Sequence, residues 1–196
     1  MRPLPSEWHD PPWQQALDTE AWLTRIPEGA TLTGMFLEAV VNAARQRGHE
    51  PKNARRKYTS FQRYPLAEHC ALLVEVAENS MPTFSTREAL RRLGRGATGT
   101  LVQSLIGRVV LGTAEGTLEM LRALAKSYVL HMRPGSVEVV ALDTGRAVVR
   151  LADIYNFLDS HNVGVFEGLF RHAKVTGRVR IASYSPTEAD FLCEWQ

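Results

Sequence analysis

Cysteine is scarce in this sequence, which has only Cys70 and Cys193 among its 196 residues. Two cysteines so far apart supply neither a disulfide framework nor a zinc site, so we expect no bound metal. The apolar neighbours of each thiol, at helical spacing around Cys70 and at strand spacing around Cys193, favour burial in a core. So few cysteines are typical of a reducing compartment, and we therefore expect a cytoplasmic protein.

Excess charge of either sign is also missing, because 23 Lys and Arg face 21 Asp and Glu, for a formal net charge of +2. No global field therefore attracts nucleic acid or an anionic membrane. The one basic cluster, residues 51–57 (PKNARRK), has no interleaved aromatic side chains on which bases could stack. We interpret it as a solvated loop, with a phosphate or acidic-partner contact as the alternative. No nucleic-acid partner is expected.

Long apolar runs are absent as well. No window approaches the roughly 18 apolar residues that a membrane-spanning helix needs, so no membrane span is expected. Residues 1–6 (MRPLPS) lack the apolar stretch of a signal peptide, and we expect none.

No catalytic signature is present. Residues 94–99 spell GxGxxG, but this motif binds a dinucleotide only between a strand and a helix, and no strand is predicted before it. Its glycines would instead permit close helix packing or a kink. Asp153, Asp159 and His161 are close in sequence, yet Asp159 is explained as a helix N-cap, and no motif groups a nucleophile with a base. We expect no catalytic residues and no enzyme.

What remains is typical of a soluble domain, with 44% hydrophobic and 22% charged residues in a chain long enough for a real core. Residues 1–25 are predicted to be a loose arm and a short helix, capped at residues 10–12. The helix would carry Trp13, Leu17 and Trp22 and dock on its own domain. No linker or repeat interrupts the rest, so residues 26–196 are predicted to form a single ligand-binding-like α+β domain.

Apolar residues recur at helical spacing in three stretches of the first half. They predict helices over residues 31–46, closed by Gly48, over residues 65–78, opened by Pro65, and from residue 85 to about residue 111. Ser85 and Glu88 form a capping box for the third helix. The inward side of this helix would carry Leu90, Leu93, Ala97, Leu101, Leu105 and Val109, and its solvent side Arg87, Arg91, Arg92 and Arg95.

The second half reads helix, hairpin, helix, hairpin. The predicted helices are residues 118–131, capped by Thr117, and residues 159–174, where Gly164 and Gly168 would let a neighbour approach closely. The predicted strands are residues 136–142 and 146–154, then 178–183 and 189–195. The fold is therefore predicted to be α+β, with an N-terminal helical layer packed on a small antiparallel sheet made of two helix–hairpin units.

Several short motifs occur in an order that resembles a known family: residues 26–27 (IP), 34–36 (GMF), 64–68 (YPLAE), 88–95 (EALRRLGR) and 104–108 (SLIGR), with a final strand that ends at Trp195. The chain resembles a myxobacterial paralogous family, domain of unknown function 2378, over about residues 20–196. That family is similar in element order to haem nitric-oxide and oxygen sensors, vinyl-reductase-type ligand-binding domains and vesicle-tethering subunits. The resemblance implies a module that binds a ligand or forms a dimer.

The same resemblance suggests no haem. In the haem-binding relatives an axial histidine lies about three turns before the first hairpin, where this chain reads Leu121-Arg122-Ala123. Their Tyr-x-Ser-x-Arg clamp would fall at residues 151–155 (LADIY), and residues 58–62 (YTSFQ) carry a near match in the wrong place. Cys70 is the one residue placed like the cysteine of an acylated tethering subunit, and a core thiol is the simpler interpretation. We expect no cofactor.

We therefore expect a non-catalytic cytoplasmic sensory or regulatory module that binds a small apolar molecule or a protein partner. The predicted ligand-binding residues are Phe36, Leu124, Tyr128, His131, Tyr155 and Phe166. A structural role at the end of its helix, bonding terminal carbonyls or complementing the dipole, is the simpler interpretation of His131. His69, His161 and His172 have no partner at ligand spacing. The alternatives are a dimeric interaction module without a ligand and, less favoured, an enzyme or a haem-based gas sensor.

Overall fold

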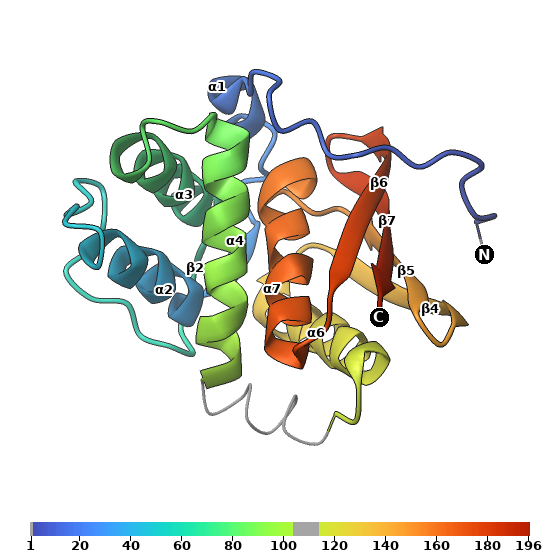
Figure 1. Ribbon diagram of the computed structural model, residues 1–196. Helices are drawn as coiled ribbons and strands as arrows, with labels where there is room; N and C mark the ends of the chain where they lie inside the picture. Colours follow the sequence, from blue (N-terminus) through green and yellow to red (C-terminus); the bar gives the residue numbers. More distant parts are fainter. Residues whose placement is uncertain (1, 104–113) are drawn as a thin grey trace.

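The computed structural model describes residues 2–103 and 114–196 of the chain. Its first half is mainly helical and its second half alternates helices with β-hairpins (Figure 1). The first-half elements are α1 (Thr19–Leu23), β1 (Thr31–Thr33), α2 (Gly34–Arg45), β2 (Arg63–Pro65), α3 (Leu66–Ser80) and α4 (Thr86–Gln103). The second-half elements are α6 (Thr117–His131), β3 (Met132–Arg133), β4 (Ser136–Asp143), β5 (Arg146–Ala152), the π-helical turn η1 (Leu158–Asn162), α7 (Val163–Ala173), β6 (Gly177–Ser185) and β7 (Glu188–Trp195). Leu105, Val109 and the predicted helix end near residue 111 lie outside the described residues.

The two hairpins form one four-stranded antiparallel sheet in the order β4-β5-β7-β6. β5 and β7 pair at its centre, with Val149 opposite Phe191. α7 packs its buried side against this sheet, where the rings of Phe166 and Phe191 lie 5.1 Å apart. The arrangement confirms the predicted α+β class and its two helix–hairpin units. Among the helices in the described ranges, none is long and apolar enough to cross a membrane.

A second, three-stranded sheet in the order β2-β1-β3 was not predicted. Its central strand is Thr31–Thr33, in which Leu32 pairs with both Tyr64 and Met132. The predicted helix start at residue 31 is therefore wrong, because these residues pair as a strand and α2 begins at Gly34. The helical spacing of the apolar residues could not show this, since strand formation here depends on partners about 30 and 100 residues away.

The predicted first helix also begins too early. Asp18 caps α1, its carboxylate accepting a hydrogen bond from the Ala21 N–H at 2.9 Å, and residues 13–17 are not helical. The docking of the tryptophans is confirmed: Trp22 stacks on Phe157 at 5.3 Å and donates a hydrogen bond to the Tyr155 carbonyl at 2.7 Å. Trp13 lies under the guanidinium of Arg91, 4.0 Å away.

The N-terminal arm meets the edge strand β6 and then crosses the four-stranded sheet (Figure 1). His9 exchanges two backbone hydrogen bonds with Ile181 of β6, at 3.0 and 2.9 Å. Arg2 forms ion pairs with Glu188 and with the fully buried Asp190, and its guanidinium lies 3.8 Å from the ring centre of Tyr184. The arm thus covers backbone groups of an edge strand that would otherwise face solvent. The predicted boundary between arm and domain, at residues 25 and 26, stays a prediction.

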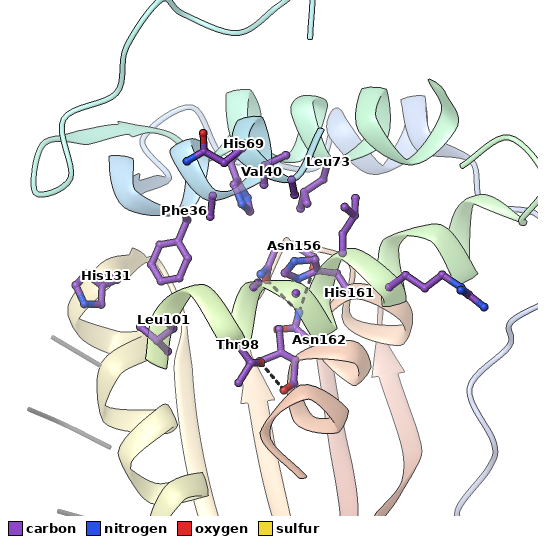
Figure 2. A pocket seen from close by; sticks show the side chains of 18 of the residues that line it. Phe36, Val40, His69, Leu73, Thr98, Leu101, His131, Asn156, His161 and Asn162 are labelled. Carbon is purple, nitrogen blue, oxygen red and sulfur yellow. Dashed lines mark hydrogen bonds between the residues drawn. The ribbon is translucent and has the colours of Figure 1, made fainter. Parts of the chain in front are cut away.

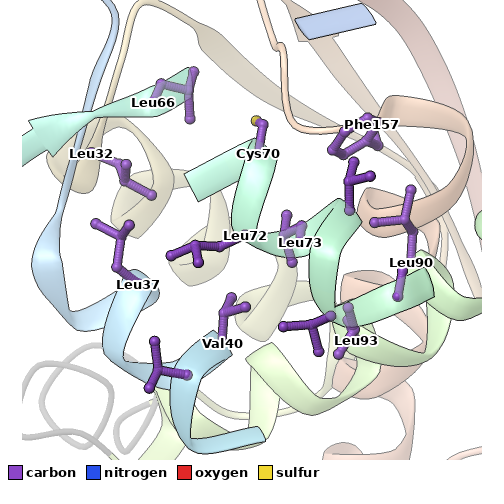
Figure 3. Close-up of a cluster of buried hydrophobic side chains, with 14 of the residues drawn as sticks. Leu32, Leu37, Val40, Leu66, Cys70, Leu72, Leu73, Leu90, Leu93 and Phe157 are labelled. Carbon is purple, nitrogen blue, oxygen red and sulfur yellow. The ribbon is translucent and has the colours of Figure 1, made fainter. Parts of the chain in front are cut away.

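Two clusters of buried apolar side chains form the core. The first lies between α1, α2, α3, the small sheet and the start of α4 (Figure 3), and it includes Leu32, Leu37, Cys70 and Leu90. The second lies between α6, α7 and the four-stranded sheet, and includes Cys193. Both cysteines are fully buried and free, as predicted. Partly buried Phe36 and Tyr128 pack against both clusters, so the two cores meet at these side chains.

α4 and α7 approach so closely that glycine is required between them. A Cβ atom at Gly164 would collide with the carbonyl oxygen of Arg91, and one at Gly94 with the carbonyl oxygen of His161. A Cβ at Gly168 would lie 2.7 Å from the carbonyl oxygen of Arg95. The prediction of close packing is confirmed for these glycines. It does not extend to Gly96 or Gly99, where a Cβ would meet nothing within 4 Å.

Ion pairs add to this helix contact, and they correct two predictions. The Nε atoms of Arg91 and Arg95 lie 2.8 and 2.6 Å from Glu167 Oε2 of α7, and Arg87 pairs with Asp159 of η1. These three arginines are therefore half-buried between elements rather than on the solvent side, where Arg92 alone of the four is exposed. Asp159 is not an N-cap, because its carboxylate is engaged by Arg87 from another helix, a partner that local sequence does not reveal.

Gly164→Ala should lower the free energy of unfolding by about 2 kcal/mol or more, because the added methyl group forces α7 away from α4. The matched control is Gly99→Ala, on the exposed face of α4, where the gain in helix propensity should raise stability by about 0.5–1 kcal/mol. Urea denaturation of both variants measures the difference. Equal effects of the two substitutions would contradict the close packing of α4 and α7.

Candidate functional site

An interior cavity of about 200 Å³ lies where the two cores meet. Side chains from α2, α3, α4, α6, the π turn and the start of α7 line it (Figure 2). An engineered cavity of about 150 Å³ in another protein binds benzene, so this one has room for a ligand of roughly one ring. The apolar part of its wall is formed by Phe36, Ala39, Val40, Leu73, Leu93, Ala97, Leu101, Leu124, Met132 and Val165.

Four of the six predicted ligand-binding residues line this cavity: Phe36, Leu124, Tyr128 and His131. Tyr155 and Phe166 do not. Phe166 faces the sheet and packs on Phe191, because its side of α7 belongs to the second core. The side chain of Tyr155 packs against the first core, and its carbonyl accepts a hydrogen bond from Trp22. Ligand binding by the four lining residues stays a prediction.

The polar end of the cavity is built by a strained segment between β5 and α7. Asp153 and Phe157 both have φ of +57°, a left-handed conformation that is uncommon for residues with side chains. Phe157 precedes the π turn Leu158–Asn162. The helix predicted from residue 159 therefore starts as a π-helical turn and becomes α-helical only at Val163. π turns within helices are frequent at functional sites. This segment brings Asn156, His161 and Asn162 to the cavity wall.

The side chains of Asn156, Asn162 and Tyr128 are joined by hydrogen bonds. Tyr128 donates its hydroxyl to Asn156 Oδ1 at 2.8 Å, and Asn162 Nδ2 donates to the same oxygen and to the Asn156 carbonyl, both at 3.1 Å. Burial raises the pKa of the Tyr128 hydroxyl well above its usual value, so this group stays protonated as the donor. Thr98 of α4 donates to the Val165 carbonyl at 2.7 Å. The polar network therefore has a fixed geometry.

His69 and His161 are not satisfied in this way. Both are buried, with 3% and 4% of their surface exposed, and their ring centres lie 6.2 Å apart in an edge-to-face arrangement. The Nδ1 atom of each is buried and has no hydrogen-bond partner among the described residues. Burial lowers the pKa of His69 to about 3, with a smaller effect from His161, and that of His161 to about 4. Both rings are therefore neutral at pH 7, each with one donor and one acceptor nitrogen.

His131 lies at the other end of the cavity, beside Phe36. Its Nδ1 hydrogen-bonds with the Thr33 hydroxyl at 3.1 Å, and burial lowers its pKa. The terminal carbonyl of Leu130 accepts a hydrogen bond from Arg63 instead, at 3.0 Å. The prediction that His131 bonds the terminal carbonyls is therefore wrong, because β1, the strand missed from the sequence, supplies a hydroxyl partner. The alternative role, complementing the dipole in the last turn of α6, stays a prediction.

The lining carries no negative charge: none of the described residues around the cavity is Asp or Glu. Two exposed arginines, Arg47 and Arg92, stand at its rim. Within the described ranges, no three His, Cys, Asp or Glu side chains are grouped so that they could hold a metal ion. The chemistry on offer is apolar contact, neutral hydrogen bonding and a weakly cationic entrance.

Sequence reasoning missed the pairing of His69 with His161 and the roles of Asn156 and Asn162. Each histidine is unremarkable alone, since they are 92 residues apart and belong to different halves of the chain. One available signal was the run of polar residues at positions 159–162 (DSHN) inside an otherwise apolar pattern. Which of these four residues reach the cavity depends on the π turn, and His161 and Asn162 are the two that do.

The fold is that of H-NOX proteins. The chain superposes with a TM-score of 0.68 on the H-NOX domain from Shewanella oneidensis in the Fe(II)CO ligation state, at 11% identity and covering 84% of this chain and 99% of that one. For the Fe(II) unliganded H-NOX protein from K. algicida the TM-score is 0.59, at 16% identity, with 84% and 97% covered. No curated protein matches the chain by sequence.

The chain belongs to the family described as Protein of unknown function (DUF2378), which matches residues 25–196. The resemblance inferred from the short motifs is thereby confirmed, and so is the likeness to the haem nitric-oxide and oxygen-binding fold. The similarity to vinyl-reductase-type domains and tethering subunits stays a prediction.

The positions that the resemblance assigns to haem ligands do not carry them in this chain. A haem macrocycle is several times the size of benzene, whereas the cavity holds roughly one ring. Leu121, where the resemblance places an axial histidine, is packed in the second core, as are Leu151 and Ile154 where it places the clamp. His69, His131 and His161 line the cavity and could each offer an imidazole nitrogen.

The free energy of unfolding should fall as the pH drops from 6.5 toward 4. The pKa values of His69 and His161 are lowered from 6.5 in the folded protein, so the unfolded chain binds more protons in this range. Stability is therefore full above pH 6.5 and is lost by up to about 1.4 kcal/mol per pH unit for each histidine. Urea denaturation at several pH values measures this slope, which the double variant His69→Leu/His161→Leu should flatten. Identical slopes in both proteins would show that the rings are not buried and neutral.

Proposed function

We propose that this chain is a non-catalytic sensory or regulatory domain that binds one small organic molecule in the cavity between its two cores. The observation that carries this proposal is the cavity itself, an interior space of about 200 Å³ with a largely apolar wall and a few convergent polar groups. Such a combination is typical of small-molecule sites. The likeness to H-NOX structures, which are described by their ligation states, supports binding of a small ligand.

The position of the cavity suggests how binding could be signalled. Phe36 and Tyr128 line it and pack against both core clusters, so a ligand between them contacts both halves of the domain at once. A ligand that fits one relative arrangement of the halves better than another would shift the population toward it. A protein partner that contacts both halves could read this shift. We expect the domain to act in the cytoplasm.

The absence of catalysis is part of the proposal. Burial raises the pKa of both cysteine thiols, which opposes formation of the nucleophilic thiolate. Within the described residues, neither His69 nor His161 hydrogen-bonds to a serine, cysteine or acid that it could activate or be oriented by. These arrangements favour a binding site over a reactive one.

Saturating toluene or phenol should raise the melting temperature of the purified domain, because a ligand that binds the folded state alone stabilises it. Ala97→Phe, which places a ring in the cavity from α4, should abolish this rise while leaving the domain folded. The matched control is Ala141→Phe, at an exposed position near the end of the edge strand β4, which should leave the rise unchanged. Differential scanning fluorimetry measures all three proteins. No rise in the original chain with either compound would contradict the proposal.

Two alternatives have their own measurements. If native mass spectrometry of the purified protein gives only a clean dimer mass and neither compound binds, a ligand-free dimerisation module becomes the better interpretation. Addition of haemin should give no Soret band with the sharpness and stoichiometry of specific ligation. A stoichiometric band that His69→Leu or His161→Leu removes would instead assign the site to haem.

A further inference from the structure

The cavity has two chemically different ends, and the polar end indicates which kind of molecule it accepts. His69 of α3 and His161 of the π turn point toward each other from opposite sides, and Asn156 and Asn162 lie beside His161 (Figure 2). Phe36 and Leu101 mark the other end, where His131 is the polar residue and bonds Thr33 through Nδ1. An entirely apolar wall would serve a hydrocarbon, so the polar end needs a separate explanation.

The asparagines do not provide that explanation, but the histidines do. Asn156 accepts hydrogen bonds from Asn162 and from Tyr128, and the two asparagines complete the fold of the strained segment. His69 and His161 are buried just as deeply but leave Nδ1 without a partner among the described residues, and so do two other lining residues, His131 at Nε2 and Ser127 at Oγ. Buried polar groups in proteins are almost always hydrogen-bonded, so two unsatisfied imidazoles on one cavity wall indicate a missing partner. A purely structural position would be filled better by leucine or phenylalanine.

The charge of the lining limits what that partner can be. A metal dication or an organic cation would be buried without any carboxylate in the described lining to balance it. An anion at the two histidines would need a protonated ring there, and burial opposes the charged form of both. The arginines of the lining, Arg47 and Arg92, are exposed to solvent. An uncharged group that donates and accepts hydrogen bonds meets neither obstacle, because each neutral imidazole can do both.

We propose that the polar end of the cavity recognises an uncharged organic molecule of about one ring through a hydroxyl or carbonyl group that hydrogen-bonds to His69 or His161. The ring lies against the apolar wall formed by Phe36, Val40 and Leu124. This inference rests on the proposed function, since it specifies the ligand of the same cavity.

Four compounds of similar size separate the possibilities: toluene, phenol, benzoate and benzylammonium. Isothermal titration calorimetry at neutral pH should give phenol a dissociation constant at least about tenfold lower than those of the other three. A cavity without hydrogen-bond partners gives the opposite order, because the phenol hydroxyl would lose its water and gain nothing. Toluene binding more tightly than phenol would therefore overturn the inference, as would tighter binding of benzoate or benzylammonium.

Replacing one histidine tests the assigned partner. His161→Leu should weaken phenol binding about tenfold, leave toluene binding unchanged or tighter, and leave the melting temperature unchanged or higher. His69→Leu should act in the same direction. The matched control is His172→Leu, on the exposed side of α7, which should alter neither affinity. A histidine with a structural role only would show the reverse: a lower melting temperature and an unchanged order of phenol and toluene.

The two levels of the proposal fail in different ways. If none of the four compounds binds the original chain, the proposed small-molecule function falls and this inference falls with it. If toluene binds and phenol binds no better, the cavity is a ligand site and only the assignment of the polar end is wrong. Should a leucine variant not fold, the order of the four compounds on the original chain still decides.

Discussion

The close contact between α4 and α7 is the constraint on which the rest of the structure depends. Glycine at positions 94 and 164 lets the two helix backbones touch, and Gly94 meets the backbone carbonyl of His161 itself. The ion pairs of Arg91 and Arg95 with Glu167 hold the same two helices along their exposed side. Because α4 belongs to the helical layer and α7 covers the sheet, this contact joins the two halves and fixes the place of the π turn between them.

The geometry of the polar end follows from that contact. With α7 held against α4, the chain must leave β5 and enter the helix within ten residues, and it does so through left-handed Asp153 and Phe157 and one π-helical turn. Such conformations cost on the order of 1–3 kcal/mol each, and unsatisfied buried imidazoles cost about as much. A sequence under selection for stability alone would not concentrate these costs at one cavity. Their coincidence is what supports a binding role for this region.

Much of the fold was predictable because its signals are local. The two hairpins, the helix opened by Pro65 and the glycines at positions 164 and 168 follow from spacing and turn chemistry within a few residues. The strand Thr31–Thr33 was not predictable in this way, because it exists only through pairing with β2 and β3. The same limit applies to Arg87 and Asp159, whose partners lie on other elements.

For the site, too, residues with a local signal were predicted and residues that depend on distant partners were not. Phe36, Leu124, Tyr128 and His131 were accessible from the sequence because they lie on the inward stripes of α2 and α6. His69 and His161 were not, since the polar run at positions 159–162 is the one local signal and it does not point to His69, which faces His161 from another helix. Tyr155 and Phe166 were predicted to bind the ligand because they are aromatic and close in sequence to the predicted pocket. Their side chains instead pack in the two cores.

A crystal structure of the domain grown with phenol tests the central claim most directly. The account predicts density for one ring in the cavity, with its oxygen at a hydrogen-bond distance of about 2.7–3.2 Å from an imidazole nitrogen of His69 or His161. A ring bound with its oxygen toward the entrance would contradict it. So would a phenol-free cavity in which both imidazoles are paired with protein groups.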